Sequence, residues 1–500
     1  MKPFSHHLLP FFCVFLLQTC LLLSPAQVSA GIKDVVVKIY TVYNKHNYHE
    51  PWQMHGQGSR QGSGVIISGN RILTNAHVVS DQTFIQVRKS GKVKRYTAIV
   101  DKVYHKSDLA LLKVKDESFF SNLSVIPYGS LPNIKDDVFV YGFPVGGDKL
   151  SITRGVISRV EHKQYNHSSA YLLACQIDAS VNQGSSGGPV IQDDKIVGIA
   201  LQTAVGNQIE NIGYIVPVPV IQHFLDDISD ESLDGIPELG LSLQRLENPD
   251  MRRKYRMEEK QSGVLVVDVY PGSPAAGKIQ TEDVLVRMEG KNIDNDGTVE
   301  FRKGERTYLE YLVQKKQVDE TVEMTVSRNG ELLKVEFSLS KPLHSFELVP
   351  HEQYDVSPEY FIIGGLVFMP LTLNYLMEYG NEDNFFYHAP TELLNYYYNG
   401  EQEKNRREIL ILSKVLADDA NIGYHDFVNG VINKVNGIKL KEMKDLVEAF
   451  ETEEDVRYHE IEDIRGFKIV LDKKKVVNAK KRILENYKIA SDRSENFIRE

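Results

Sequence analysis

Short apolar runs separated by Gly, Asn, Asp and Ser dominate the chain from residue 32 to about residue 220. Runs of this length and spacing are typical of the strands of an all-β sandwich or barrel. A short amphipathic helix is expected at residues 221–228, where it would end this β-rich domain. The predicted strands lie at residues 34–40, 64–68, 83–87, 109–114, 138–141, 172–177 and 195–200.

A weak internal repeat follows a polar linker at residues 229–237. Each copy has a strand, a connector of small residues, a second strand and a Gly turn, at residues 263–291 and again at 409–438. The two strands start 20 residues apart in the first copy (264 to 284) and 21 in the second (410 to 431). The repeat predicts two related modules of about 100 residues each. The apolar stretch at 361–377 is interrupted by Gly and Pro, so we expect a buried strand there rather than a membrane span.

The first 30 residues have the features of a secretory signal peptide. Lys2 supplies a positive charge, residues 8–23 are apolar, and Val28-Ser29-Ala30 offers a cleavage site. We therefore expect an exported mature chain that starts near Gly31, in a bacterial periplasm, with no stable membrane insertion after cleavage. A membrane tether through an uncleaved signal is the alternative.

Charge and cysteine content exclude several classes of protein. The chain of 500 residues has a formal net charge of -10, which disfavours binding to nucleic acid. After the signal only Cys175 remains, so neither an intramolecular disulfide nor a thiolate metal site can form. We expect no metal and no cofactor, and there is no Walker-type phosphate loop.

Three segments of the β-rich domain carry the residues of a nucleophilic enzyme. Ser186 lies in a glycine-rich loop, residues 182–189, whose backbone N–H groups can converge on a developing oxyanion. A serine hydroxyl needs a base, and His77 at the end of an apolar strand is the candidate. Asp108, which opens the next apolar strand, can orient that histidine. The order His, Asp, Ser within one β-rich domain predicts a catalytic triad.

These three segments resemble the catalytic blocks of the HtrA/Deg serine endopeptidases. The resemblance extends to residues 62–67, 141–144, 153–158 and 176–179. It implies a mainly β chain, with a chymotrypsin-like double β-barrel at residues 31–228 followed by two α+β PDZ-like domains. His77 would be the general base, Asp108 its partner and Ser186 the nucleophile. The backbone N–H groups of Gly184, Ser185 and Ser186 would form the oxyanion hole; the family usually has Asn where this chain has Ser185.

The same resemblance assigns the two repeated modules to PDZ domains, at residues 238–342 and 343–490. PDZ domains bind a peptide as an added strand and hold its carboxylate on backbone N–H groups. The segment Glu238-Leu239-Gly240-Leu241 resembles that carboxylate-binding loop. The second module is most similar to the C-terminal PDZ domain of the plant-type Deg branch, and either peptide binding or assembly could be its role.

The expected cleavage specificity depends on two positions. Trypsin-like specificity needs an Asp six residues before the nucleophile, where this chain has Ser180. Gly213, Tyr214 and Ile215 resemble the strand that lines the substrate pocket, and Ile215 stands where the family usually has Ala. We therefore expect cleavage after small apolar residues such as Val, Ala or Ile.

The resulting hypothesis is an ATP-independent serine endopeptidase that degrades misfolded or unfolded polypeptides. Its expected partners are unfolded chains and peptide C-termini or segments at the first PDZ domain. The family resemblance implies a homotrimer or a multiple of trimers. A chaperone or peptide-binding scaffold with little proteolysis is the alternative function. The loop at residues 44–60, with the only tryptophan, Trp52, is either a regulatory or subunit-connecting loop or a disordered one.

Overall fold

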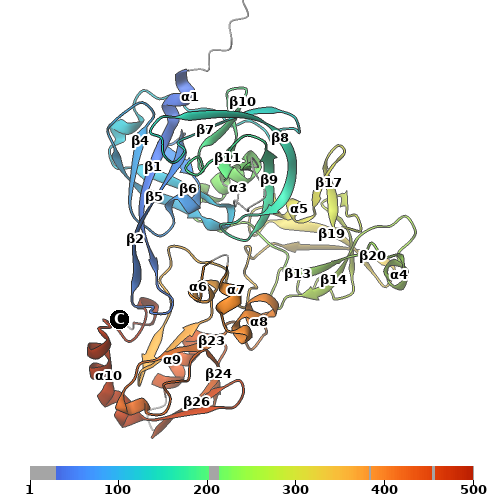
Figure 1. Ribbon diagram of the computed structural model, residues 1–500. Helices are drawn as coiled ribbons and strands as arrows, with labels where there is room; N and C mark the ends of the chain where they lie inside the picture. The colour runs from blue at the N-terminus through green and yellow to red at the C-terminus, as the bar shows by residue number, and fades with distance from the viewer. Residues whose placement is uncertain (1–29, 202–212, 382–383, 453–456, 499–500) are drawn as a thin grey trace, which may run out of the picture.

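The computed structural model describes residues 30–201, 213–381, 384–452 and 457–498. All but the last residue of the predicted signal peptide therefore lies outside the described residues. The described chain forms two closed β-barrels followed by two smaller units that each contain a sheet and helices (Figure 1). The middle unit extends over residues 236–342, and the C-terminal unit over residues 358–498. We refer to residues 343–357 between them as the connecting segment.

The first barrel has six antiparallel strands in the order β1-β2-β3-β6-β5-β4. In the part of β2 that lies in the barrel, buried and exposed residues do not alternate, because every residue from Gly62 onward is buried. The helical pieces are the short α1 (Ala30–Val35), the single turn α2 (Ala76–Val79), and the 3-10 turns η1 (His105–Ser107) and η2 (Glu117–Phe120). The strands are β1 (Val36–His46), β2 (Met54–Ile67), β3 (Arg71–Thr74), β4 (Gln82–Lys89), β5 (Tyr96–Tyr104) and β6 (Leu109–Val114).

The second barrel has the strand order β10-β11-β12-β9-β8-β7. The expected helix at its end is present as α3 (Val218–Asp227), with η3 (Ile228–Asp230) after it. The apolar residues of both barrels form one continuous core. The strands are β7 (Asp137–Gly142), β8 (Ser151–Gln164), β9 (Tyr171–Ile177), β10 (Pro189–Gln192), β11 (Lys195–Leu201) and β12 (Gly213–Pro217).

The middle unit is built on a sheet of order β13-β14-β15-β19-β20, with β13 at one edge. Its helices are α4 (Pro249–Lys254) and α5 (Glu310–Gln314). The strands are β13 (Leu241–Arg245), β14 (Val264–Val269), β15 (Val284–Met288), β16 (Lys291–Asn292), β17 (Thr298–Arg302), β18 (Glu305–Tyr308), β19 (Thr321–Arg328) and β20 (Glu331–Ser338).

The C-terminal unit has the sheet order β21-β22-β23-β24-β26-β27. Its strands are β21 (Phe361–Ile363), β22 (Leu366–Pro370), β23 (Leu410–Val415), β24 (Gly430–Val435), β25 (Ile438–Lys439), β26 (Tyr458–Asp463) and β27 (Lys468–Asp472). The helices are α6 (Leu373–Met377), α7 (Phe385–His388), α8 (Thr391–Asn399), η4 (Asp419–Asn421), α9 (Met443–Glu451), α10 (Lys473–Tyr487) and η5 (Glu495–Phe497). The stretch expected to be one buried strand is instead the hairpin β21–β22 followed by α6, because Gly364 and Gly365 both adopt positive φ and turn the chain.

The predicted internal repeat is present in the two units. In each copy the first two strands pair antiparallel, β14 with β15 and β23 with β24. The second strand then turns back into a two-residue strand, β16 or β25. Both turns have positive φ at two successive residues, Glu289-Gly290 and Asn436-Gly437, as a type I′ hairpin requires.

The β1–β2 hairpin extends beyond its barrel and reaches the C-terminal unit (Figure 1). Tyr48 near its tip is 5% exposed and belongs to the core of that unit, and Trp52 packs against the same core. Glu378 accepts hydrogen bonds from the backbone N–H of Tyr48 and from the ring of His55, each at 2.8 Å. The loop predicted to be regulatory, subunit-connecting or disordered thus contacts the C-terminal unit of the same chain.

No helix within the described residues is long and apolar enough to cross a membrane.

Candidate active site

His77 and Asp108 are held together by two hydrogen bonds. The backbone N–H of His77 donates to one Asp108 carboxylate oxygen at 2.8 Å, and His77 Nδ1 lies 2.7 Å from the other. His77 is placed by the single turn α2, directly after β3, while Asp108 ends η1 with a left-handed φ of 52° and leads into β6. Asn75 reinforces this junction, since its side-chain amide donates to the Asp108 carbonyl at 2.9 Å. The arrangement fixes which imidazole nitrogen faces the carboxylate and turns Nε2 away from it.

The charge state of Asp108 follows from its surroundings. Burial by itself would raise the pKa of this fully buried carboxyl, but the charges of His77 and His167 and the hydrogen bonds from His77 outweigh it. The pKa of Asp108 is therefore lowered. An ionised carboxylate beside His77 can stabilise a proton gained by the imidazole.

The loop that carries Ser186 lies against the backbone of both barrels, and this close contact leaves no room for side chains at its glycines. A Cβ on Gly187 would lie 2.1 Å from the Ser63 carbonyl oxygen, and one on Gly188 would lie 2.0 Å from the Tyr141 carbonyl oxygen. The Ser63 hydroxyl donates to the Gly184 carbonyl and accepts from the Phe143 N–H, both at 2.8 Å. The close backbone approach explains why this loop cannot tolerate side chains there.

The hydroxyl of Ser186 is buried and has no hydrogen-bond partner among the described residues. It therefore makes no hydrogen bond to His77, although both residues line one pocket of about 460 Å³. Of the three backbone donors predicted for the oxyanion hole, the N–H of Ser185 is already bonded to the Asn182 carbonyl at 2.9 Å. The described structure thus contains a formed His–Asp pair next to a serine that is not yet bonded to it.

One wall of this pocket comes from residues that the sequence did not single out. Tyr354, from the connecting segment, and His167, from the β8–β9 turn, both line it. Their rings stack with centroids 3.9 Å apart, and the Tyr354 hydroxyl donates to the His167 carbonyl at 2.8 Å. His105 Nδ1 lies 2.9 Å from His167 Nε2, and its other nitrogen lies 2.9 Å from Asp355. Burial lowers the pKa of His167 well below its ordinary value. No local motif marks Tyr354, because only the fold brings the connecting segment to the pocket.

The predicted substrate-pocket residues lie in β12, directly after residues 202–212, which are outside the described residues. Gly213, Tyr214 and Ile215 are all buried, and Ile215 packs against Gly198 of β11. The Tyr214 hydroxyl donates to Glu161 at 3.1 Å. None of the three lines the pocket that contains His77 and Ser186.

The predicted PDZ loop leads into the edge strand β13. Gly240 has a φ of 70°, and a Cβ there would lie 2.3 Å from that of Ser273. Glu238 is occupied internally, since its carboxylate accepts from the backbone N–H of Ser345 at 2.9 Å. Burial raises the pKa of Glu238 to about 7. Leu239 is buried. The pairing of β13 with β14 begins at Leu241, which lies opposite Val269. On its other side β14 pairs with β15.

Three segments match known domain models. Residues 62–199 match a trypsin-like peptidase domain, and residues 237–339 and 349–496 each match a PDZ domain. An HtrA-type protease solved with a decapeptide aligns with 63% of this chain and 97% of its own at a TM-score of 0.50. At 21% identity this likeness concerns the fold. The predicted mainly β class, with a double barrel and two PDZ domains, is confirmed.

Several relatives are plant proteases. The chain is 38% identical over 467 residues to putative protease Do-like 3, mitochondrial, of Arabidopsis thaliana, covering 92% of this chain and 80% of that one. It is 36% identical over 479 residues to protease Do-like 2, chloroplastic, of the same plant, covering 95% and 77%.

These names correct one prediction from the sequence. The expected bacterial periplasmic location is wrong, because the relatives are named as mitochondrial or chloroplastic proteins. An apolar segment near the N-terminus did not distinguish these compartments.

The pocket contains a His–Asp pair and a serine, the chain matches a trypsin-like domain and two PDZ domains, and its relatives are Do-like proteases. The chain therefore belongs to the HtrA/Deg (Do-like) family of serine endopeptidases.

Proposed function

We propose that this protease cuts unfolded or misfolded polypeptides through a covalent intermediate on Ser186. His77 takes the proton from the Ser186 hydroxyl as its oxygen attacks the substrate carbonyl, and then gives that proton to the leaving amine. A water molecule repeats the sequence and releases the acyl group. Asp108 holds the histidine in the tautomer that this requires. The observation that carries the proposal is the double hydrogen bond between His77 and Asp108 in the pocket that also contains Ser186.

The catalytic residues must complete their alignment when substrate binds. The Ser186 hydroxyl has to rotate toward His77 Nε2, and the backbone N–H groups of Gly184, Ser185 and Ser186 have to face the substrate oxygen. In the described structure Ser185 still donates to Asn182, so the 182–186 segment changes its hydrogen bonding during this step. Such a change would keep the enzyme inactive until an extended chain occupies the site.

Substrate choice and recognition extend the proposal. We assign the side-chain pocket to Gly213, Tyr214 and Ile215, with preference for small apolar residues before the cut bond. The first PDZ domain would bind peptide termini or segments along the edge of β13, next to Glu238, Leu239, Gly240 and Leu241. The protein would assemble as a trimer or a multiple of trimers. It would work in an organelle such as the mitochondrion or chloroplast named for its relatives.

The test compares the unmodified protein with its Ser186→Ala variant on an unfolded model protein, without ATP and with a metal chelator present. Mass spectrometry of the products gives the residue before each cut. Ser232→Ala, an exposed serine of the linker, is the matched control. We expect digestion by the unmodified protein and by Ser232→Ala only, with cuts after Val, Ala or Ile. Equal digestion by Ser186→Ala would refute the assigned nucleophile, while suppression of aggregation without any digestion would favour a chaperone.

A further inference from the structure

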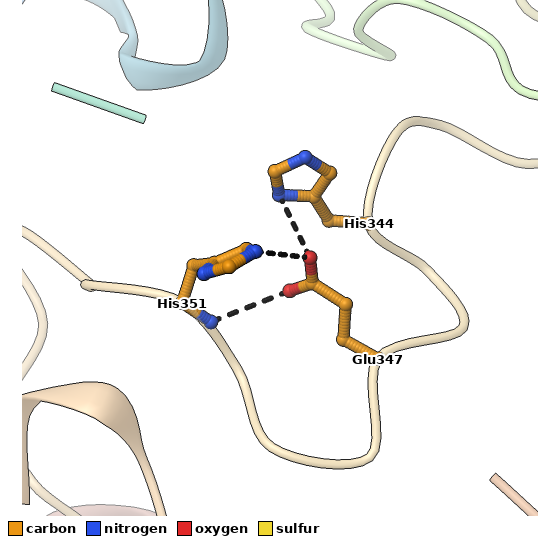
Figure 2. Close-up of side chains that lie close together, drawn as sticks. All are labelled: His344, Glu347 and His351. Carbon is orange, nitrogen blue, oxygen red and sulfur yellow. Dashed lines mark hydrogen bonds and ion pairs between the residues drawn. The ribbon is translucent and has the colours of Figure 1, made fainter. Parts of the chain in front are cut away.

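Two histidines and one glutamate of the connecting segment point their side chains at a common centre. Figure 2 shows His344, Glu347 and His351 on one turn of the chain, with both rings directed at the carboxylate between them. Glu347 Oε1 lies 3.2 Å from His344 Nδ1 and 3.1 Å from His351 Nε2. One donor atom from each of the three residues lies within 4.8 Å of the others.

These separations resemble those between the ligands of a tetrahedral metal ion. Zinc binds imidazole nitrogen at about 2.0–2.1 Å, so neighbouring ligand atoms around a tetrahedral ion are about 3.3 Å apart. Two of the three separations in the cluster already have nearly this value. Two histidines and one glutamate are also a known donor set for zinc, with the fourth position left open. The side chains of His344, Glu347 and His351 are 15%, 24% and 26% exposed, so all three keep some contact with solvent.

The second ring nitrogen of His351 is held as metal-bound histidines usually are. His351 Nδ1 lies 2.9 Å from the hydroxyl of Tyr397 on α8. A partner at that nitrogen fixes the orientation of the ring and favours a free lone pair on the nitrogen that faces the ion. The backbone N–H of His351 also donates to the other oxygen of Glu347, at 3.3 Å.

A lysine supplies the positive charge of the cluster in the described structure. Lys106 Nζ lies 2.6 Å from His344 Nδ1, the nitrogen that faces Glu347. Since an ammonium group donates to that lone pair, His344 cannot donate through the same nitrogen to Glu347. The nitrogen and the carboxylate therefore face each other as acceptors beside a cation. Lys106 belongs to η1, two positions before Asp108, so this contact ties the connecting segment to the protease domain.

We propose that His344, Glu347 and His351 bind one zinc-type divalent ion, which takes over the position of the Lys106 ammonium. Binding would replace the contact between the connecting segment and η1 by a metal site within the segment. The proposal does not depend on the proteolytic activity proposed above. It is tested in the full chain carrying Ser186→Ala, which removes self-digestion from the measurement.

The experiment is a titration with Zn²⁺ alone by calorimetry, followed by visible spectroscopy with Co²⁺ in its place. We expect one ion per chain and the absorption of tetrahedral cobalt. Loss of an outer-shell partner weakens metal binding by about 10- to 100-fold. Glu347→Gln and His351→Ala each remove a ligand, so each should weaken zinc binding by more than this. His55→Ala is the matched control, because His55 also touches a glutamate, Glu378, but no third ligand residue joins that pair among the described residues.

Two outcomes would overturn the site: no zinc binding by the Ser186→Ala chain, or unchanged affinity in both donor variants. Lys106→Met tests the exchange directly, because removal of the competing charge should tighten zinc binding by about 10-fold. Unchanged or weaker binding in Lys106→Met would overturn the exchange. Circular dichroism of each variant verifies that lost binding is not lost folding.

Discussion

The ring of Tyr354 stacks on the ring of His167 at a centroid distance of 3.9 Å and an interplanar angle of 25°. His167 belongs to the protease domain, whereas Tyr354 belongs to the connecting segment, near the start of the stretch that matches the second PDZ domain. The His167 ring lies 6.1 Å from that of His77. A segment outside the two barrels therefore completes the wall of the active-site pocket.

This contact predicts that Tyr354→Ala lowers kcat/KM for a peptide substrate. Loss of the ring removes the stacking on His167 and the hydroxyl bond to its carbonyl, so the pocket wall loses its support. We expect a fall of about 10-fold, since a displaced pocket wall misplaces the substrate. Tyr354→Phe retains the ring and should lose much less. Peptidase kinetics check this, and an Ala variant as active as the unmodified protein would contradict a supporting role.

A second prediction concerns the carboxylate of the triad. Asp108→Asn retains the shape of the side chain but presents an amide to His77, which favours the wrong imidazole tautomer. The expected loss in kcat is about 10⁴-fold, by analogy with other serine proteases. Asp116→Asn, an exposed aspartate beyond the other end of β6, is the control and should retain activity. A loss of less than about 10-fold in Asp108→Asn, far below the loss expected for this residue, would argue against this triad.

The contact between the β1–β2 hairpin and the second PDZ domain can be followed by fluorescence. Trp52 is the only tryptophan of the chain and packs against the core of that domain. Tyr48→Ala removes a neighbouring buried ring, at a cost of about 3 kcal/mol for a large buried aromatic. We expect the Trp52 emission to shift to longer wavelength as the contact loosens. Tyr398→Ala, whose side chain is largely exposed on α8, should leave the emission unchanged.

The first PDZ domain should detach from the protease domain as the pH falls. His162 of β8 is buried, with Nδ1 2.7 Å from the Thr307 hydroxyl and Nε2 2.9 Å from the Gln314 side-chain oxygen. Burial lowers the pKa of His162 to about 4, from an ordinary value of 6.5. The separated or unfolded form therefore binds a proton more readily between pH 6.5 and pH 4.

The full stability of the interface around His162 is thus present above pH 6.5 and decreases as the pH falls toward 4. At about 1.36 kcal/mol per pKa unit, the free energy lost is at most about 3 kcal/mol. Thermal unfolding of the Ser186→Ala protein across this range measures the effect. His162→Gln cannot gain a proton, so its unfolding temperature should depend less on pH. Parallel pH curves for the two proteins would show that His162 does not titrate at this interface.

The candidate triad positions could be predicted from the sequence because each belongs to a local pattern. His77 ends an apolar strand, Asp108 begins one, and Ser186 lies among glycines that a crowded loop requires. The repeat of the PDZ domains was visible for the same reason, since strand length and the Gly turn are local properties. The β-rich first domain, the two repeated modules and the family follow from such signals, whereas the hairpin and helix within residues 361–377 do not.

Contacts between distant segments were decided only by tertiary structure. Nothing near Tyr354 in the sequence indicates that it stacks on His167, and nothing near Trp52 indicates packing on the second PDZ domain. The same holds for the Ser186 hydroxyl, which has no hydrogen-bond partner among the described residues although its neighbours match the family pattern. The physical reason is that local sequence determines backbone preference and hydrophobic pattern, whereas contacts between side chains far apart in the chain arise from how the completed domains pack.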